Sequence, residues 1–138
     1  MDITTYDAEL KKTYTVRYVE PNIIEYVGLT DQNYTAEKSI RFARLLDYDI
    51  KKILADHPNT NFFLVAELEG GIGTTLPKEA RKIYIDIVNS PRIVKTAAIS
   101  ESGSIKNFIN FIATILGKGN KIRVFSKRYD AEEWFKEK

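Results

Sequence analysis

The chain has no cysteine, a single histidine and a single tryptophan among its 138 residues. Without cysteine it forms no disulfide, no thiolate metal site and no cysteine nucleophile, and this suits a reducing compartment. One histidine excludes a metal site built from several imidazoles. The net charge is only +2, from 21 basic and 19 acidic residues, which is too small for the long-range field of a dedicated nucleic-acid binder.

Long hydrophobic runs are also missing. The longest, around 108–116, is interrupted by Asn110 and Thr114 and is shorter than the roughly twenty residues of a membrane span. Residues 1–12 are polar and of mixed charge, so they lack the apolar segment of a secretory signal. We therefore expect a cytoplasmic protein without a transmembrane segment.

What the chain does contain is the composition of one folded domain, with 43% hydrophobic and 29% charged residues. Its length allows one continuous core and is too short for two comfortable ones. No repeat, low-complexity segment or linker divides it. We expect an N-terminal arm at residues 1–12 and a single domain at residues 13–138.

Strand and helix patterns alternate along that domain. β-branched and aromatic residues on either side of Pro21-Asn22 predict an antiparallel hairpin at 13–20 and 23–27. Apolar residues at helical spacing and continuous apolar runs predict the remaining elements. These are helices at 35–56, 77–90, 104–116 and 126–135, the third of them capped by Ser102 or Ser104 and closed by Gly117, and strands at 61–66, 92–100 and 121–126.

The resulting order is β-β-α-β-α-β-α-β-α. Strands that alternate with helices require right-handed crossovers, so the later strands are expected to be parallel, with the first hairpin strand antiparallel at or near the edge. The sequence therefore predicts an α/β fold with a mixed, mainly parallel five-stranded sheet and packed helices.

Four stretches from about residue 13 onward resemble a known family. They are Phe62-Phe-Leu-Val-Ala-Glu67, Pro77-Lys-Glu-Ala-Arg81, the strand from Val94 to Ile99, and Val124-Phe-Ser followed by Ala131-Glu-Glu-Trp-Phe135. Together with the element order they resemble the STAS domain, the anti-sigma-factor antagonist fold, in its SpoIIAA-like and STAS/SEC14-type branches.

This resemblance implies a non-enzymatic module that binds a partner protein. In the regulatory members a serine after the central strand is switched by phosphorylation, and an acidic residue often ends that strand, as Glu67 does here. The phosphorylated members have an Asp-Ser pair at the helix start, whereas this chain reads Gly70-Gly-Ile-Gly-Thr-Thr75. Only Thr74 or Thr75 can take the place of that serine.

The glycine-threonine segment joins a strand end to a helix start, where unpaired N–H groups and the helix dipole favour an anion. It has neither the lysine of a P-loop nor the glycine spacing of a dinucleotide fold. Gly70, Gly71, Gly73, Thr74 and Thr75 are thus candidates for binding a ligand or partner, and the two threonines for phosphorylation. The simpler interpretation is a flexible connection in which Thr75 caps the helix.

The predicted third helix is apolar over more than one stripe, because Phe108 and Phe111 widen the line of its isoleucines. Burial between sheet and helices explains this pattern. A dimer seam or a groove for an apolar ligand are the alternatives.

No catalytic centre is evident in the sequence. His57 follows a predicted helix end and has no second imidazole to work with, and acidic pairs such as Glu67 with Glu69 lack a partner pocket. Basic residues around the last strand, among them Arg123 and Arg128, are typical of edge protection. We expect no catalytic residues, no metal and no cofactor.

The leading hypothesis is therefore a regulatory or scaffolding module that binds a protein partner, with a homodimer as an option and nucleic acid disfavoured. The alternative is a protein that binds or senses a small ligand, either a nucleotide at the glycine-threonine segment or an apolar molecule such as a lipid under the third helix.

Overall fold

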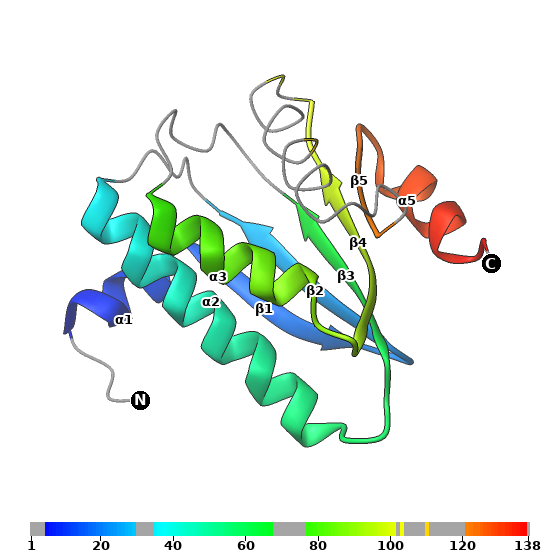
Figure 1. The fold of residues 1–138 in the computed structure, drawn as a ribbon, viewed down its shortest axis with the longest axis horizontal. Helices are drawn as coiled ribbons and strands as arrows, with labels where there is room; N and C mark the ends of the chain where they lie inside the picture. The colour runs from blue at the N-terminus through cyan, green and yellow to red at the C-terminus, as the bar shows by residue number, and fades with distance from the viewer. Residues whose placement is uncertain are drawn as a thin grey trace.

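The computed structural model describes residues 5–29, 35–67, 77–101, 103, 110 and 121–137. These residues form an α/β fold with a five-stranded mixed sheet (Figure 1). Apart from residue 110, the third helix of the prediction lies outside the described residues. The described elements are α1 (Thr5–Lys11), β1 (Tyr14–Val19), β2 (Ile23–Gly28), α2 (Ala36–Asp56), β3 (Phe62–Glu67), α3 (Lys78–Val88), β4 (Ile93–Ile99), β5 (Ile122–Phe125) and α5 (Arg128–Phe135).

The strands follow one another across the sheet in the order β1-β2-β3-β4-β5. β1 is antiparallel to β2, and every later neighbouring pair is parallel, as expected for a hairpin followed by helical crossovers. β2 to β5 therefore end at one edge, which we call the carboxyl edge and define by Gly28, Glu67, Ile99 and Phe125. This edge is where α/β sheets generally bind ligands.

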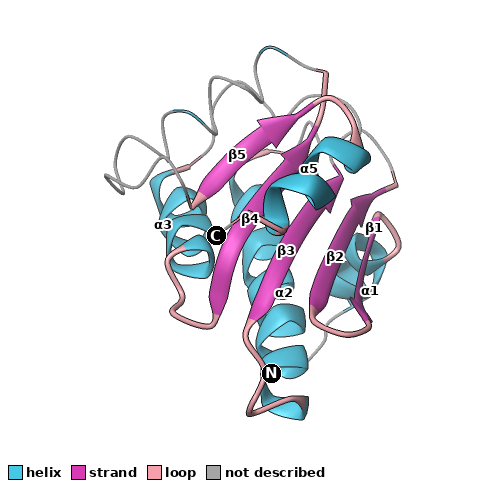
Figure 2. Ribbon diagram, turned by 90° about the vertical axis from the view of Figure 1, so that its right-hand side faces the viewer, coloured by secondary structure: helices cyan, strands magenta, loops and turns pink. Residues whose placement is uncertain are grey.

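Each face of the sheet has its own core, because successive strand residues point to opposite sides. Phe62 and Leu64 pack on the face covered by α1, α2 and α3, which we call the helical face. Phe63 and Val65 point to the other face, where they meet α5. Figure 2 shows α5 on one side of the sheet and α2 and α3 on the other.

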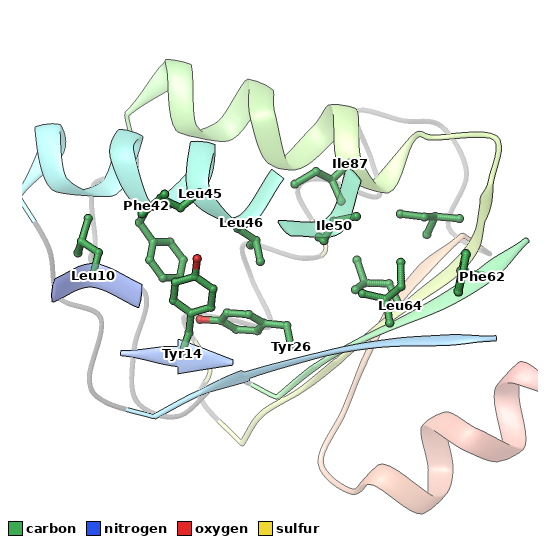
Figure 3. Packing of buried hydrophobic residues seen from close by; sticks show 12 residues of the cluster. Leu10, Tyr14, Tyr26, Phe42, Leu45, Leu46, Ile50, Phe62, Leu64 and Ile87 are labelled. Atoms are coloured by element: carbon green, nitrogen blue, oxygen red, sulfur yellow. The ribbon is translucent and has the colours of Figure 1, made fainter. Parts of the chain in front are cut away.

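The larger core lies between α2 and the sheet. Phe42 approaches Tyr14 and Tyr26 edge-on, with ring centroids 5.0 and 6.2 Å away, a favourable geometry for aromatic pairs (Figure 3). Leu45 is fully buried one turn further along α2. The residues whose helical spacing predicted this helix contribute to the same core, and those that are buried are Ala43, Leu46 and Ile50.

The helix starts follow from local chemistry. The Thr35 hydroxyl accepts a hydrogen bond from the Lys38 backbone N–H at 3.3 Å and caps α2, as the sequence predicts. α3 begins directly after Pro77, also as expected. α5 begins at Arg128, two positions later than Ser126, the residue at which the sequence analysis starts the helix.

Helix α1 was not expected from the sequence, which treats residues 1–12 as an arm. Leu10 is only 1% exposed and belongs to the larger core. Asp7 accepts a hydrogen bond from Arg41 at 2.6 Å, and Lys11 donates to Asp49 at 3.1 Å. Leu10 and these two ion pairs thus attach residues 5–11 to the core and to α2.

Candidate functional site

Of the residues that the sequence singles out for binding, the structure describes Glu67. Glu67 is the last residue of β3 and lies at the carboxyl edge, and its side chain is 36% exposed. The other candidates, Gly70, Gly71, Gly73, Thr74, Thr75, Phe108 and Phe111, lie outside the described residues.

Glu67 belongs to a group of charged side chains on the face of the sheet that α5 covers. We call this group the Glu25 cluster, and it consists of Arg17, Glu25, Glu67, Arg128 and Glu132. Arg128, in the first turn of α5, reaches across the sheet to both β2 and β3. The group therefore joins β1, β2, β3 and α5.

Glu25 is the centre of the cluster, because its side chain is only 6% exposed. Arg17 Nε donates to one carboxylate oxygen at 2.5 Å, and Arg128 Nη1 donates to the other at 2.6 Å. Arg17 stands directly opposite Glu25 in the β1–β2 register. Two cationic donors thus satisfy a carboxylate that the fold removes from water.

These contacts change the proton affinities of the cluster. Burial by itself would raise the pKa of Glu25, but the hydrogen bonds and positive charges of Arg17 and Arg128 outweigh it, so the pKa is lowered. Burial would likewise lower the pKa of Arg128, but the Glu25 carboxylate, assisted by Glu67 and Glu132, raises it. Both groups therefore stay charged at neutral pH.

A carboxylate with a lowered pKa is a weak base, whereas general acid–base catalysis favours a pKa near the working pH. Arg128 is 3.5 Å from Glu67 and 3.3 Å from Glu132, so its other contacts are also ionic. The geometry therefore suits a set of ion pairs that hold α5 to the sheet better than it suits a proton-transfer site.

The far end of α5 is fastened by Lys95 on β4. Its Nζ donates to the carbonyl oxygens of Trp134 at 2.7 Å and Glu137 at 2.8 Å, where a helix end offers unpaired acceptors. The same ammonium lies 4.9 Å from the Trp134 ring centroid. Between the two ends, Phe135 stacks on Phe63 with ring centroids 4.6 Å apart. Helix α5 is thus held to the sheet along its length.

Apolar side chains remain exposed beside this anchored helix. Tyr129 follows Arg128 and is 68% exposed, and Leu29 directly follows β2 and is 52% exposed. Both therefore belong to segments that adjoin the carboxyl edge. Among the described residues, the other large exposed apolar side chains are Tyr48 on α2 and Val94 at an irregularity in the β3–β4 pairing.

His57 lies at the opposite edge of the sheet, just before β3. Its ring stacks on Tyr18 with centroids 4.1 Å apart and meets Phe62 edge-on at 6.0 Å. The residue ends α2, as predicted, but an aromatic ring partly covers it. In the described part of the chain, no group of three or more potential metal ligands comes together.

Sequence reasoning overlooked Glu25 and Arg17. A signal for that pair was present, because Arg17 and Glu25 lie at equal distances before and after Pro21, and a tight hairpin turn there places them opposite each other. Arg128 was interpreted as edge protection, but its side chain points to Glu25 and Glu67 instead. Its partner Glu25 is 103 positions away, so no local pattern reveals the contact.

Comparison of the chain with known proteins found no matching family model, curated protein or solved structure. Within the described part of the chain, no helix is both long enough and apolar enough to cross a bilayer.

Proposed function

We propose that this chain is a non-enzymatic, STAS-like regulatory or scaffolding module of the cytoplasm that binds a protein partner at its carboxyl edge. The observation that carries the proposal is the exposure of two apolar side chains at the carboxyl edge: Leu29, which follows β2, and Tyr129, which follows Arg128 of the Glu25 cluster. An apolar side chain next to fixed charges is typical of binding surfaces, where aromatic anchors supply most of the affinity.

The attachment of the helix that carries Tyr129 supports this function. Its neighbour Arg128 ties the start of α5 to β2 and β3, and Lys95 ties the end of the helix to β4. Because the backbone of α5 is already held in place, a partner that docks has to order only the side chain of Tyr129. Helix α5 therefore presents Tyr129 on a preorganised backbone.

The glycine-threonine segment adds regulation to the proposal. It connects Glu67 at the carboxyl edge to Pro77 at the start of α3. Phosphorylation of Thr74 or Thr75 would add roughly −1.5 to −2 charges to this connection and so change the affinity of a charged partner. The partner's own charges decide whether binding strengthens or weakens.

Site-specific photo-crosslinking in the cells that make the protein tests this function. A photo-reactive phenylalanine analogue replaces Tyr129 in one variant and Tyr48, an exposed tyrosine on α2, in the control. We expect the analogue at position 129 to capture one recurrent protein that the analogue at position 48 does not capture. The same set of captured proteins from both positions, or none from position 129, contradicts the proposal.

The regulatory part is tested in the same cells with Thr74→Ala and Thr75→Ala combined. If either hydroxyl is the switch, the yield of the captured protein changes relative to the wild type. An unchanged yield removes the switch from the proposal and leaves the docking surface.

A further inference from the structure

Strand β1 is the outermost strand at one end of the sheet order, and Figure 2 shows it at the rim. In an antiparallel pair, alternate residues direct their N–H and C=O groups toward the partner strand. The Leu29 N–H donates to the Thr13 carbonyl at 2.9 Å, which makes the odd-numbered residues of β1 the ones bonded to β2. The backbone N–H and C=O groups of Tyr14, Val16 and Tyr18 therefore point away from β2, toward the outer edge of the sheet.

The other side of β2 agrees with this assignment. The Phe63 N–H donates to the Asn22 carbonyl at 3.0 Å, so the even-numbered residues of β2 face β3 and the odd-numbered ones face β1. Among the residues that the structure describes, no turn or loop group bonds to the outward backbone groups of β1. They form a row of donors and acceptors ready to pair.

β1 has one cation, Arg17, which is paired with Glu25, and otherwise lacks the features that protect edge strands. Its sequence, YTVRYV, has no proline, glycine or lysine, and its register with β2 runs without a bulge. β5, at the other end of the sheet order, is shorter and carries Arg123, with Lys121 just before it. Short strands and cationic side chains are the usual protection against pairing. The two ends of the sheet thus differ.

We propose that β1 pairs antiparallel with β1 of a second copy of this chain, about a two-fold axis through Val16. Tyr14 then stands opposite Tyr18 of the second copy, and Val16 stands opposite its counterpart. Every outward backbone group of β1 finds a partner in this register. The two sheets join into one continuous sheet, and the inference does not depend on the proposed function.

Charge selects this register over its neighbours. Here Arg17 lies opposite Thr15 of the second copy, and both side chains are exposed. In the neighbouring register that places Val16 opposite Tyr18 of the second copy, Arg17 lies opposite Arg17, a destabilising pair of like charges. In the other neighbouring register, which places Tyr14 opposite Val16, Tyr18 extends beyond β1 of the second copy. One register thus pairs the strand with its own copy over its whole length without a like-charge contact, and this favours a second copy as the partner.

Two variants of Thr15 test the register with opposite signs. Thr15→Lys puts a cation opposite Arg17 of the second copy, whereas Thr15→Glu puts a carboxylate there. Each substitution occurs twice in the dimer, so we expect the dimer dissociation constant to rise about 2- to 30-fold with lysine and to fall by a similar factor with glutamate. Because the side chain is exposed, both variants should fold, which circular dichroism checks.

The measurement is sedimentation equilibrium of the full chain at protein concentrations up to about 1 mM, the range in which a weak strand-edge contact becomes populated. A wild-type mass that stays at the monomer value overturns the proposal. A dimer that responds to both charges in the same direction, or to neither, also overturns it.

Disulfide trapping gives an independent result, because the chain has no cysteine of its own. Val16→Cys brings two thiols together at the axis, where Cα atoms of a hydrogen-bonded pair are about 5.5 Å apart, within disulfide range. Thr15→Cys is the matched control, since its counterpart is offset along the strand. We expect a mild oxidant to crosslink the first variant at least tenfold faster. Equal rates contradict the register.

Discussion

The ion pair between Glu25 and Arg128 fixes the start of α5, so its removal should destabilise the whole domain. Arg128→Met keeps the aliphatic stem and removes the guanidinium. The lost hydrogen bond is 2.6 Å long and joins a carboxylate that is 6% exposed to a guanidinium that is 28% exposed. A charge-assisted bond of this kind contributes about 1.5–3 kcal/mol, while the longer contacts to Glu67 and Glu132 add at most a few tenths each.

We therefore expect Arg128→Met to lower the free energy of unfolding by about 2–3 kcal/mol. For a chain of this length the corresponding fall in Tm is roughly 6–15 °C. Urea unfolding followed by the fluorescence of Trp134 is a suitable assay, because this single tryptophan is buried on α5 itself. Lys136→Met is the matched control, since it removes an exposed ion pair with Glu133 from the same helix and should cost under about 0.5 kcal/mol.

A double-mutant cycle with Glu25→Gln separates the pair from its surroundings. If the two side chains act as described, the cycle returns a coupling energy of about 1.5–3 kcal/mol. A coupling energy below about 0.5 kcal/mol, or an Arg128→Met variant no less stable than Lys136→Met, would show that this ion pair does not hold α5 to the sheet.

Three further outcomes follow from the structure. The pKa of Glu25 is lowered by folding, so the stabilisation by its charge is complete above its unfolded-state pKa and is lost as the pH falls through the folded-state value; acid titration of unfolding should show a shallower loss for Glu25→Gln, and parallel curves would contradict this. Leu45→Ala empties a fully buried position and should cost about 2–5 kcal/mol, against under about 0.5 kcal/mol for Leu29→Ala, as measured by urea unfolding. Tyr14→Phe removes the 2.7 Å hydrogen bond to Asp49, leaves that carboxylate with Lys11, and should cost about 1–2 kcal/mol by the same method, while an unchanged midpoint would show that the bond contributes nothing.

A thermal-shift screen addresses the alternative of a small ligand. A ligand present at a hundredfold excess over its Kd stabilises the folded state by about 2.7 kcal/mol. The proposed function predicts no such shift with nucleotides or fatty acids. A reproducible rise in Tm with either class would favour a ligand-binding protein over a partner-binding one.

Apart from α1, the order of the described elements could be predicted from the sequence, because each of these strands and helices carries its own periodicity or apolar run. The hairpin around Pro21, the cap at Thr35 and the start of α3 after Pro77 all rest on neighbours in sequence, and the structure agrees with them. Helix α1 escaped prediction because, among the side chains of this segment that the structure describes, only Leu10 belongs to the apolar core, and one apolar residue makes no periodic pattern.

The candidate site was less accessible to sequence reasoning. Glu67 was selected because it ends a buried strand, and the structure places it at the carboxyl edge. The contact from Arg128 to Glu25 depends on which face α5 covers and on the strand order, and neither is encoded locally. The exposure of Tyr129 likewise depends on which side of α5 faces the sheet.

The central claim is that the carboxyl edge of the sheet is a docking surface. The most direct test is the Kd of the protein captured at position 129, measured with a combined Leu29→Ser and Tyr129→Ser variant and with Tyr48→Ser as the control. We predict that the combined Leu29→Ser and Tyr129→Ser variant, which we call the edge variant, raises the Kd at least about tenfold, the effect of losing roughly 1.4 kcal/mol of binding free energy. The Kd of the Tyr48→Ser control should stay within about twofold of the wild-type value. An unchanged Kd for the edge variant, or an equal rise for both, would contradict the account.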